Sequence, residues 1–150
     1  MIADILVDTN VLVYAYDGRE PRKQARALET LGSLVATGRG ALSAQVLGEW
    51  YRAVTGKLRP VLSATDAASQ AAALLRAWRV LPVTSLVVLE ATRGARDHRL
   101  AYWDAQIWAT ARLNQVPLVL SEDFPDGRVL EGVRFCDPFA RSFTPAALGI

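Results

Sequence analysis

Apolar and polar positions along the chain follow two patterns, one typical of buried strands and the other of the helices that cover them. Short apolar segments predict strands at residues 2–7, 41–43, 80–83, 116–120 and 132–136. Longer segments with apolar residues along one side predict helices at residues 10–16, 21–37, 44–57, 63–78, 85–100 and 104–115. Strands that alternate with helices predict an α/β fold, a three-layer α/β/α sandwich with a central parallel sheet.

The ends of the expected helices carry residues that favour those ends. Pro21 suits the first turn of the helix over 21–37, and Gly38 follows its last residue. Ser43 suits the cap position of the next helix. A chain of 150 residues can bury one sizeable core. The sequence shows no repeat or linker, so we expect a single domain over residues 1–150.

Two acidic residues follow two of the expected strands. Asp8 comes directly after the first apolar run, and Asp123 closes a short polar stretch after the strand over 116–120. In open parallel sheets, ligands bind beyond the carboxyl ends of the strands, so these two acids are candidates for one site. Asp8 alone could equally be a helix N-cap. Either Glu122 or Asp126 could replace Asp123 as the functional acid of its turn.

Asp104 stands at the head of an apolar stripe. Ile107, Trp108 and Ala111 follow it at helical spacing and form one side of the expected helix. Asp104 therefore faces the core, where a carboxylate is costly unless it is paired, hydrogen-bonded or bound to a metal. The alternative is that Asp104 caps the start of this helix.

Glu49 gives a different signal from the other acids. In the helix over 44–57 it points away from the apolar side and lies next to Gln45 and Arg52. On pattern alone it is a solvated surface acid, with Arg52 as its ion-pair partner at i+3.

Composition narrows the classes of function only slightly. The chain has 17 basic and 15 acidic residues, a net charge of +2, and only Lys23 and Lys57 among its basic residues are lysines. Arginine pairs bidentately with phosphate, which makes a polyanionic substrate plausible. The single cysteine, Cys136, cannot form an internal disulfide and suits a reducing compartment. No apolar run reaches the roughly 18 residues of a membrane span, so we expect a cytoplasmic protein without a membrane partner.

Four segments, taken together, resemble the PIN-domain nucleases, and most closely the VapC-type toxins of bacterial toxin–antitoxin pairs. They are Leu6-Val7-Asp8-Thr9-Asn10, Leu42-Ser43-Ala-Gln-Val-Leu-Gly-Glu49, Tyr102-Trp103-Asp104-Ala105 and Leu120-Ser121-Glu122-Asp123-Phe124. Each motif is weak alone, but their order, their spacing and the total length all agree with the family. The resemblance covers essentially the whole chain.

The resemblance implies a metal-dependent endoribonuclease whose catalytic and metal-binding acids are Asp8, Glu49, Asp104 and Asp123. Carboxylates suit a hard cation, Mg²⁺ or Mn²⁺, that activates a water for attack on the phosphodiester. Asn10, Ser121 and Asp126 are expected to support these acids. Glu49 enters the site on the resemblance alone. One metal ion or two would serve this chemistry.

Basic and aromatic side chains are candidates for contacts with RNA. Arg19 and Arg22, with Lys23 and Arg26, form one group, and Arg93, Arg96 and Arg99 form another, although each could simply belong to a solvated helix face. The four tryptophans are expected in the core or in a dimer interface.

The resemblance also implies a cognate antitoxin protein and a homodimer. Two alternatives stay open at this point. One is a non-catalytic PIN-fold module that binds RNA or protein, and the other is a housekeeping RNA-processing nuclease.

Overall fold

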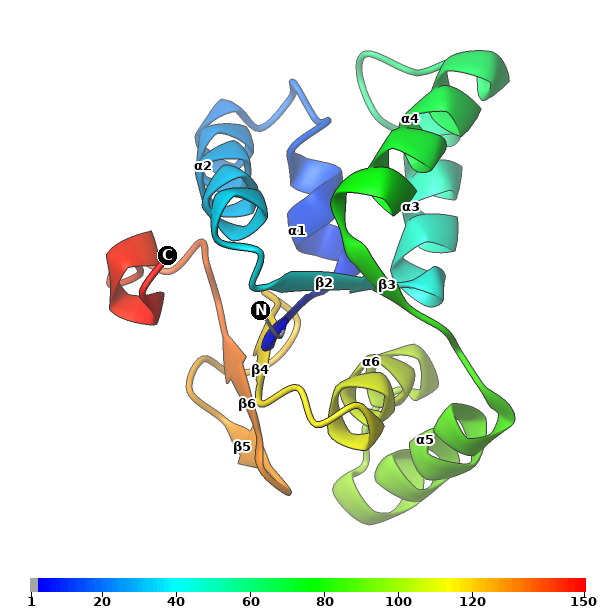
Figure 1. Cartoon of the computed structure of the whole chain (residues 1–150), viewed down its shortest axis with the longest axis vertical. Coiled ribbons are helices and arrows are strands. Elements are labelled where there is room, and N and C mark those ends of the chain that lie inside the picture. Colours follow the sequence, from blue (N-terminus) through cyan, green and yellow to red (C-terminus); the bar gives the residue numbers. More distant parts are fainter. Residues whose placement is uncertain (1–2) are drawn as a thin grey trace.

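The computed structural model describes residues 3–150, and its strands form one six-stranded sheet over this range (Figure 1). The strands are β1 (Ile5–Val7), β2 (Gly40–Ser43), β3 (Arg79–Leu81), β4 (Leu118–Leu120), β5 (Val129–Leu130) and β6 (Val133–Cys136). Their order in the sheet is β3-β2-β1-β4-β6-β5. The first strand was expected over 2–7, and residue 2 lies outside the described part of the chain.

The central sheet is parallel as expected, with one antiparallel strand added at its edge. Along the order β3-β2-β1-β4-β6, each strand is parallel to its neighbours. The edge strand β5 runs antiparallel to β6. The two strands are joined by a tight turn at Glu131 and Gly132, both with positive φ. Only two residues long, β5 is too short to produce a periodic pattern that sequence reading could detect.

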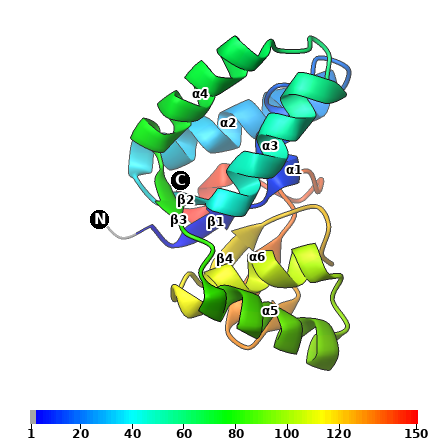
Figure 2. The ribbon, with the colours of Figure 1, turned by 90° about the vertical axis from the view of Figure 1, so that its right-hand side faces the viewer.

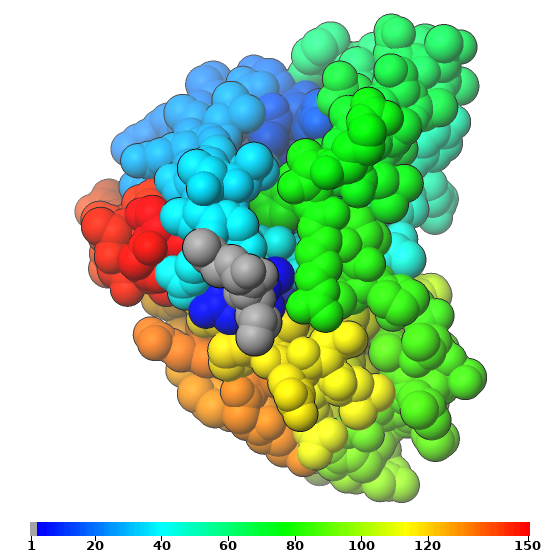
Figure 3. Space-filling view, viewed as in Figure 1, coloured from blue at the N-terminus to red at the C-terminus, as the bar shows by residue number. Residues whose placement is uncertain are grey.

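Helices cover both faces of the sheet, which confirms the three-layer α/β/α sandwich (Figures 1 and 2). The helices are α1 (Thr9–Tyr14), α2 (Pro21–Thr37), α3 (Ala44–Gly56), α4 (Ala64–Ala77), α5 (Ser85–His98) and α6 (Tyr102–Leu113), with a short 3₁₀ helix η1 (Pro145–Leu148). Helices α1 to α4 lie on one side, and α5 with α6 on the other. The space-filling view shows an indentation between these two layers at its right-hand edge (Figure 3).

Local signals place the helix starts. Ser43 accepts a hydrogen bond from the backbone N of Val46 at 3.2 Å, as expected for the cap of α3. Pro21 is the first residue of α2, and Gly38 ends it in the left-handed region with φ 68°. Helix α6 begins two residues earlier than predicted, at Tyr102.

The core is continuous across both layers. All three residues of β1 are fully buried, and the largest buried side chains include Trp50 on α3 and Trp108 on α6. Trp78 is also buried, but Trp103 is 63% exposed, so a core position is wrong for this one tryptophan. Within residues 3–150, the helices include none that is both long and apolar enough to cross a membrane.

Candidate active site

The carboxyl ends of β1 and β4 lie side by side in the middle of the sheet. β1 pairs in parallel with β2 on one side and with β4 on the other, so the chain reverses its direction of winding here. Such switch points are where open α/β sheets bind ligands. The register sets Val7 opposite Leu120, so the next residues, Asp8 and Ser121, are also neighbours. The predicted meeting of two acidic strand ends is therefore confirmed.

Asp8 is almost fully buried, with 4% of its surface exposed. Its Oδ1 accepts a hydrogen bond from the backbone N of Thr9 at 2.7 Å. Asp8 is therefore the N-cap of α1, which was the alternative to a functional role in the sequence analysis. Its Oδ2 accepts hydrogen bonds from Ser121 Oγ at 2.7 Å and from Asn10 Nδ2 at 3.3 Å. Burial nevertheless raises the pKa of Asp8 to about 7. Nearby Asp123 and Asp104 also raise it.

Asn10 and Ser121 connect Asp8 to Asp123. Asn10 Nδ2 donates to Asp123 Oδ2 at 3.0 Å, and the backbone N of Asp123 donates to Ser121 Oγ at 3.0 Å. Asn10 Oδ1 also accepts from the backbone N of Glu122 at 3.3 Å. These bonds hold the turn after β4 against the end of β1. The expected support of the acids by Asn10 and Ser121 thus has a definite geometry.

Asp104 lies in the first turn of α6 and is half-buried. The cap of that helix is Ala101, which excludes the interpretation of Asp104 as an N-cap. Burial raises the pKa of Asp104, and the charges of Asp123 and Glu49 raise it further.

The three aspartates fit a divalent cation. Asp8, Asp104 and Asp123 each offer one carboxylate oxygen, and these oxygens lie within 4.8 Å of one another. Over residues 3–150, none of the three forms an ion pair with a lysine or arginine. Crowded carboxylates without a cationic partner repel one another, and a hard cation such as Mg²⁺ or Mn²⁺ removes that repulsion.

Glu49 lies beside this group without being one of its three members. It is half-buried on α3, and Gln45 Nε2 donates to Glu49 Oε1 at 2.6 Å. The interpretation from pattern alone, a solvated acid paired with Arg52, is wrong in both respects. Glu49 borders the same groove as Asp123 and raises the pKa of Asp104.

The other acids of the turn after β4 are engaged elsewhere. Glu122 accepts hydrogen bonds from Tyr14 Oη at 2.8 Å and from Lys23 Nζ at 2.7 Å. Asp126 accepts one from the backbone N of Asp137 at 2.9 Å, and its supporting role stays a prediction. Of the three acids that the sequence left open, the structure brings Asp123 to the other two aspartates.

A groove of about 1190 Å³ runs beside the acids between α1, α3 and the start of α6. Its lining includes Glu49, Asp123 and the indole of Trp103. Three basic residues, Arg19, Arg52 and Lys57, also line it.

The candidate RNA contacts divide between the groove and other surfaces. Arg19 lines the groove while it pairs with Asp17 at 2.9 Å. Arg22 is exposed on α2, and Lys23 and Arg26 bond Glu122 and the Phe143 carbonyl respectively. Sequence reasoning missed Arg52 and Lys57 as groove residues. Nothing in the sequence distinguishes them from solvated charges.

The second group, Arg93, Arg96 and Arg99, does not line the groove. Arg93 forms ion pairs with Glu90 and, at 2.9 Å, with Glu131, while Arg96 pairs with Asp97 at 2.7 Å. These contacts place Arg93 and Arg96 in an ion-pair network on α5, and Arg99 is the C-cap residue of this helix. Their contact with RNA stays a prediction.

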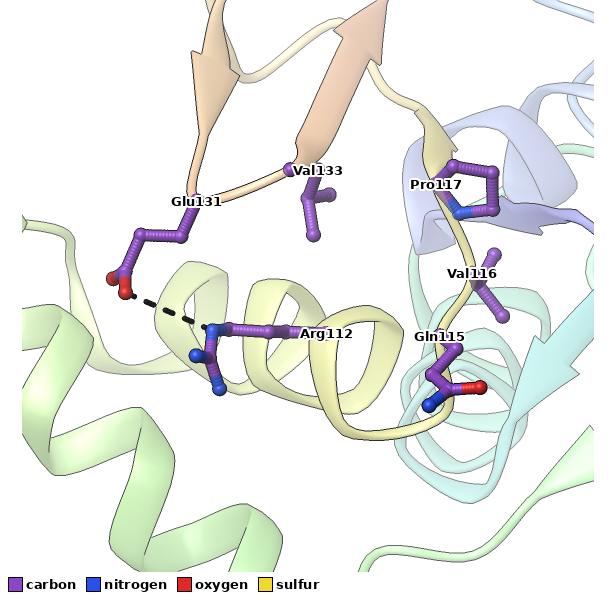
Figure 4. A pocket seen from close by; sticks show the side chains of 7 residues that line it. Arg112, Gln115, Val116, Pro117, Glu131 and Val133 are labelled. Carbon is purple, nitrogen blue, oxygen red and sulfur yellow. Dashed lines mark ion pairs between the residues drawn. The ribbon is translucent and has the colours of Figure 1, made fainter.

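A second, smaller cavity of about 160 Å³ lies at the opposite end of α6 (Figure 4). Arg112 and Glu131 face each other across it at 3.7 Å, and Val116, Pro117 and Val133 complete its wall. Because Arg112 also lies 3.5 Å from Glu90, its charge is compensated.

Comparison with known proteins gives one family and several similar structures. A family model described as PIN domain matches residues 5–124. A search of curated proteins finds no match.

Among solved structures, a toxin–antitoxin complex from Klebsiella pneumoniae has a TM-score of 0.67 and 18% identity, covering 90% of this chain and 98% of the other. DNA-bound VapBC from Salmonella typhimurium has a TM-score of 0.64 and 16% identity, covering 92% and 99%. VapC20 from Mycobacterium tuberculosis, described as a sarcin–ricin loop cleaving toxin, has a TM-score of 0.55 and 22% identity, covering 77% and 86%. At these identities the likeness shows the fold.

Proposed function

The chain belongs to the PIN domain family, and on this premise we propose that it is a metal-dependent endoribonuclease with its centre at Asp8, Asp104 and Asp123. The observation that carries the proposal is the convergence of three carboxylate oxygens within 4.8 Å of one another. Among residues 3–150, none of the three aspartates forms an ion pair with a lysine or an arginine. A group of this kind suits a divalent cation that acts on a phosphodiester.

The proposed mechanism assigns a task to each acid. Asp8, Asp104 and Asp123 would hold Mg²⁺ or Mn²⁺, which would supply charge neutralisation at the phosphate and make the attacking water more acidic. Glu49, restrained through its Oε1, would add its charge to the cation site, orient the attacking water and receive its proton. Asn10 and Ser121 keep Asp8 and Asp123 at a fixed separation. In-line attack would then break the P–O3′ bond, and the departing 3′-oxygen would take a proton from solvent, which leaves 3′-hydroxyl and 5′-phosphate ends.

The groove supports RNA as the substrate. Arg52 and Lys57 line it on the α3 side, where they can bind phosphates of the strand that lies along the groove. Trp103, 63% exposed and adjacent to Asp104, offers a ring on which an unpaired base can stack. An exposed loop of RNA, rather than a continuous duplex, combines flexible phosphates with free bases.

The names of the similar structures support a toxin role with an antitoxin protein as the partner. A homodimer is the assembly that the family resemblance implies. The Klebsiella structure is a toxin–antitoxin complex by its description, and VapC20 is described as a toxin. In this role a segment of the antitoxin would occupy the groove and exclude RNA. The cytoplasm stays the expected compartment. A housekeeping nuclease would use the same site without such a partner, and a non-catalytic module would have no need of the three acids.

Cleavage of a structured RNA by the purified chain, with and without EDTA, tests the proposal. We expect EDTA to abolish cleavage and Mg²⁺ to restore it. Asp104→Asn should lower the rate by on the order of 100-fold, because it removes one ligand charge. Asp66→Asn, the same change on the exposed start of α4, should keep full activity. Cleavage that survives both EDTA and Asp104→Asn would falsify the proposal.

A further inference from the structure

A row of hydrogen-bonded side chains crosses from α6 to α3 beside the acids. Tyr102 Oη donates to Gln106 Oε1 at 2.9 Å, and Gln106 Nε2 donates to Gln45 Oε1 at 2.9 Å. Gln45 Nε2 in turn donates to Glu49 Oε1 at 2.6 Å. We call Gln45 and Gln106 the glutamine bridge, because they join the helix that carries Asp104 to the helix that carries Glu49.

The direction of these hydrogen bonds is set by the groups at one end. Gln45 Nε2 donates both to Glu49 Oε1 and, at 3.1 Å, to the backbone carbonyl of Trp103. A carboxylate and a carbonyl can only accept, so Gln45 must present its NH₂ group to them and its oxygen to Gln106. Gln106 must then donate to Gln45, and its own oxygen accepts from Tyr102. A flipped amide at either glutamine would set acceptor against acceptor.

Gln106 occupies a position where an apolar residue would be the simpler choice. It is 5% exposed and lies between the buried residues Ala105 and Ile107 on α6. Burying an amide is costly unless its hydrogen bonds are made inside the protein. Here the Gln106 Nε2 group donates to Gln45, and the bond from Tyr102 to Gln106 Oε1 fixes the orientation of the same amide, which points to a role for the amide beyond packing.

We infer that Gln45 and Gln106 are positioning residues that hold Glu49 toward Asp104 at the metal centre. Glu49 stands on a different helix from Asp104 and outside the three carboxylates whose oxygens lie within 4.8 Å. Its side chain therefore needs a restraint, and Gln45, one turn away on α3, supplies it. The contact of Gln45 with the Trp103 carbonyl ties the same restraint to the residue before Asp104. This inference rests on the proposed function.

Binding of Mn²⁺ by the full chain, followed by the signal of free Mn²⁺ in electron paramagnetic resonance, tests the bridge independently of activity. Gln45→Met keeps the length of the side chain and removes the donor. We expect it to weaken Mn²⁺ binding by about 10- to 100-fold, as for other residues that hold the acids of a metal site in place. We expect kcat to fall by a similar factor, with little change in KM. Gln106→Met should act in the same direction. Gln70→Met, the same change on the exposed face of α4, should match the wild type.

A double-mutant cycle with Glu49→Ala asks whether Gln45 acts through Glu49. We expect Gln45→Met to cost less Mn²⁺ affinity in the Glu49→Ala background than in the wild type. An equal or larger cost there, or wild-type affinity in both glutamine variants, overturns the inference. If the wild type binds Mn²⁺ but cleaves no RNA, the proposed function fails while the binding cycle still decides the bridge. A wild type that binds no Mn²⁺ overturns both.

Discussion

At the scale of single residues, hydrogen bonds and burial act in opposite directions on the pKa of Asp8. Three donors, from Thr9, Ser121 and Asn10, hold its carboxyl group in place, and such hydrogen bonds favour the charged form. Burial outweighs them and raises the pKa to about 7. A cation bound by Asp8 would reverse that balance, because it replaces the lost hydration of the carboxylate. The residue therefore favours folding most when it is either protonated or bound to metal.

The stability of the metal-free protein should consequently fall as the pH rises. The folded state has a raised pKa at Asp8 and at Asp104, so between about pH 4 and 7 it binds more protons than the unfolded chain. Raising the pH through this range therefore lowers the free energy of unfolding, by on the order of a few kcal/mol for a buried group such as Asp8. Urea unfolding in EDTA at pH 5 and pH 8 measures the decline.

Asp104→Asn is the matching variant for this pH dependence. It removes one titrating group and one of the charges that raise the pKa of Asp8. The loss of stability from pH 5 to pH 8 should therefore be smaller in Asp104→Asn than in the wild type. A decline of the same size in both proteins would show that these carboxyl groups do not govern the stability.

Residue by residue, the sequence predicts the acids unevenly. Asp8 follows an apolar strand and Asp104 heads an apolar stripe, so pattern alone indicates their places. For Asp123 the pattern indicates only the turn, because Glu122 and Asp126 lie in it as well. Glu49 could not be found in this way, because the direction of its side chain depends on a hydrogen bond from Gln45, itself held from another helix. Such contacts between distant segments leave no periodic trace in the sequence.

At the scale of elements, α5 and α6 pack unusually closely at Gly94. A Cβ built on Gly94 would lie 2.6 Å from Cζ3 of Trp108, a fully buried indole. The absence of a side chain on α5 therefore lets the ring of α6 fill this space. The pair of helices forms the layer that carries Asp104, so its packing sets where that acid stands.

Gly94→Ala should destabilise the protein by about 1–3 kcal/mol, because the methyl group and the indole cannot share the space. Gly32→Ala makes the same change in α2, where a Cβ would meet nothing within 4 Å. This control should be neutral or raise the stability by up to about 1 kcal/mol. Equal effects of the two substitutions on the midpoint of urea unfolding would contradict the described packing.

Elements were predictable where the pattern is long or the caps are specific. The long helices α2 and α3 begin where Pro21 and Ser43 indicate. The start of α6 was misplaced because its cap, Ala101, makes no side-chain hydrogen bond and so gives no signal. The strand β5 was missed because its pairing with β6 depends on a turn rather than on apolar alternation.

At the scale of the whole molecule, the fold brings together charges that are far apart in the sequence. The acids come from the ends of β1 and β4, from α3 and from α6, and they meet beside a groove with basic residues along α3. A net charge of +2 conceals this separation of negative site and positive lining. The arrangement suits a polyanion that contacts the basic residues while one phosphate reaches the acids.

Asp8, Asp104 and Asp123 should bind a divalent cation between them. Anomalous diffraction from a crystal grown with Mn²⁺ would locate that cation. We expect an anomalous peak in contact with a carboxylate oxygen from each of the three aspartates, and its loss in Asp104→Asn. Peaks confined to other acids, or none between these three at saturating Mn²⁺, would contradict it.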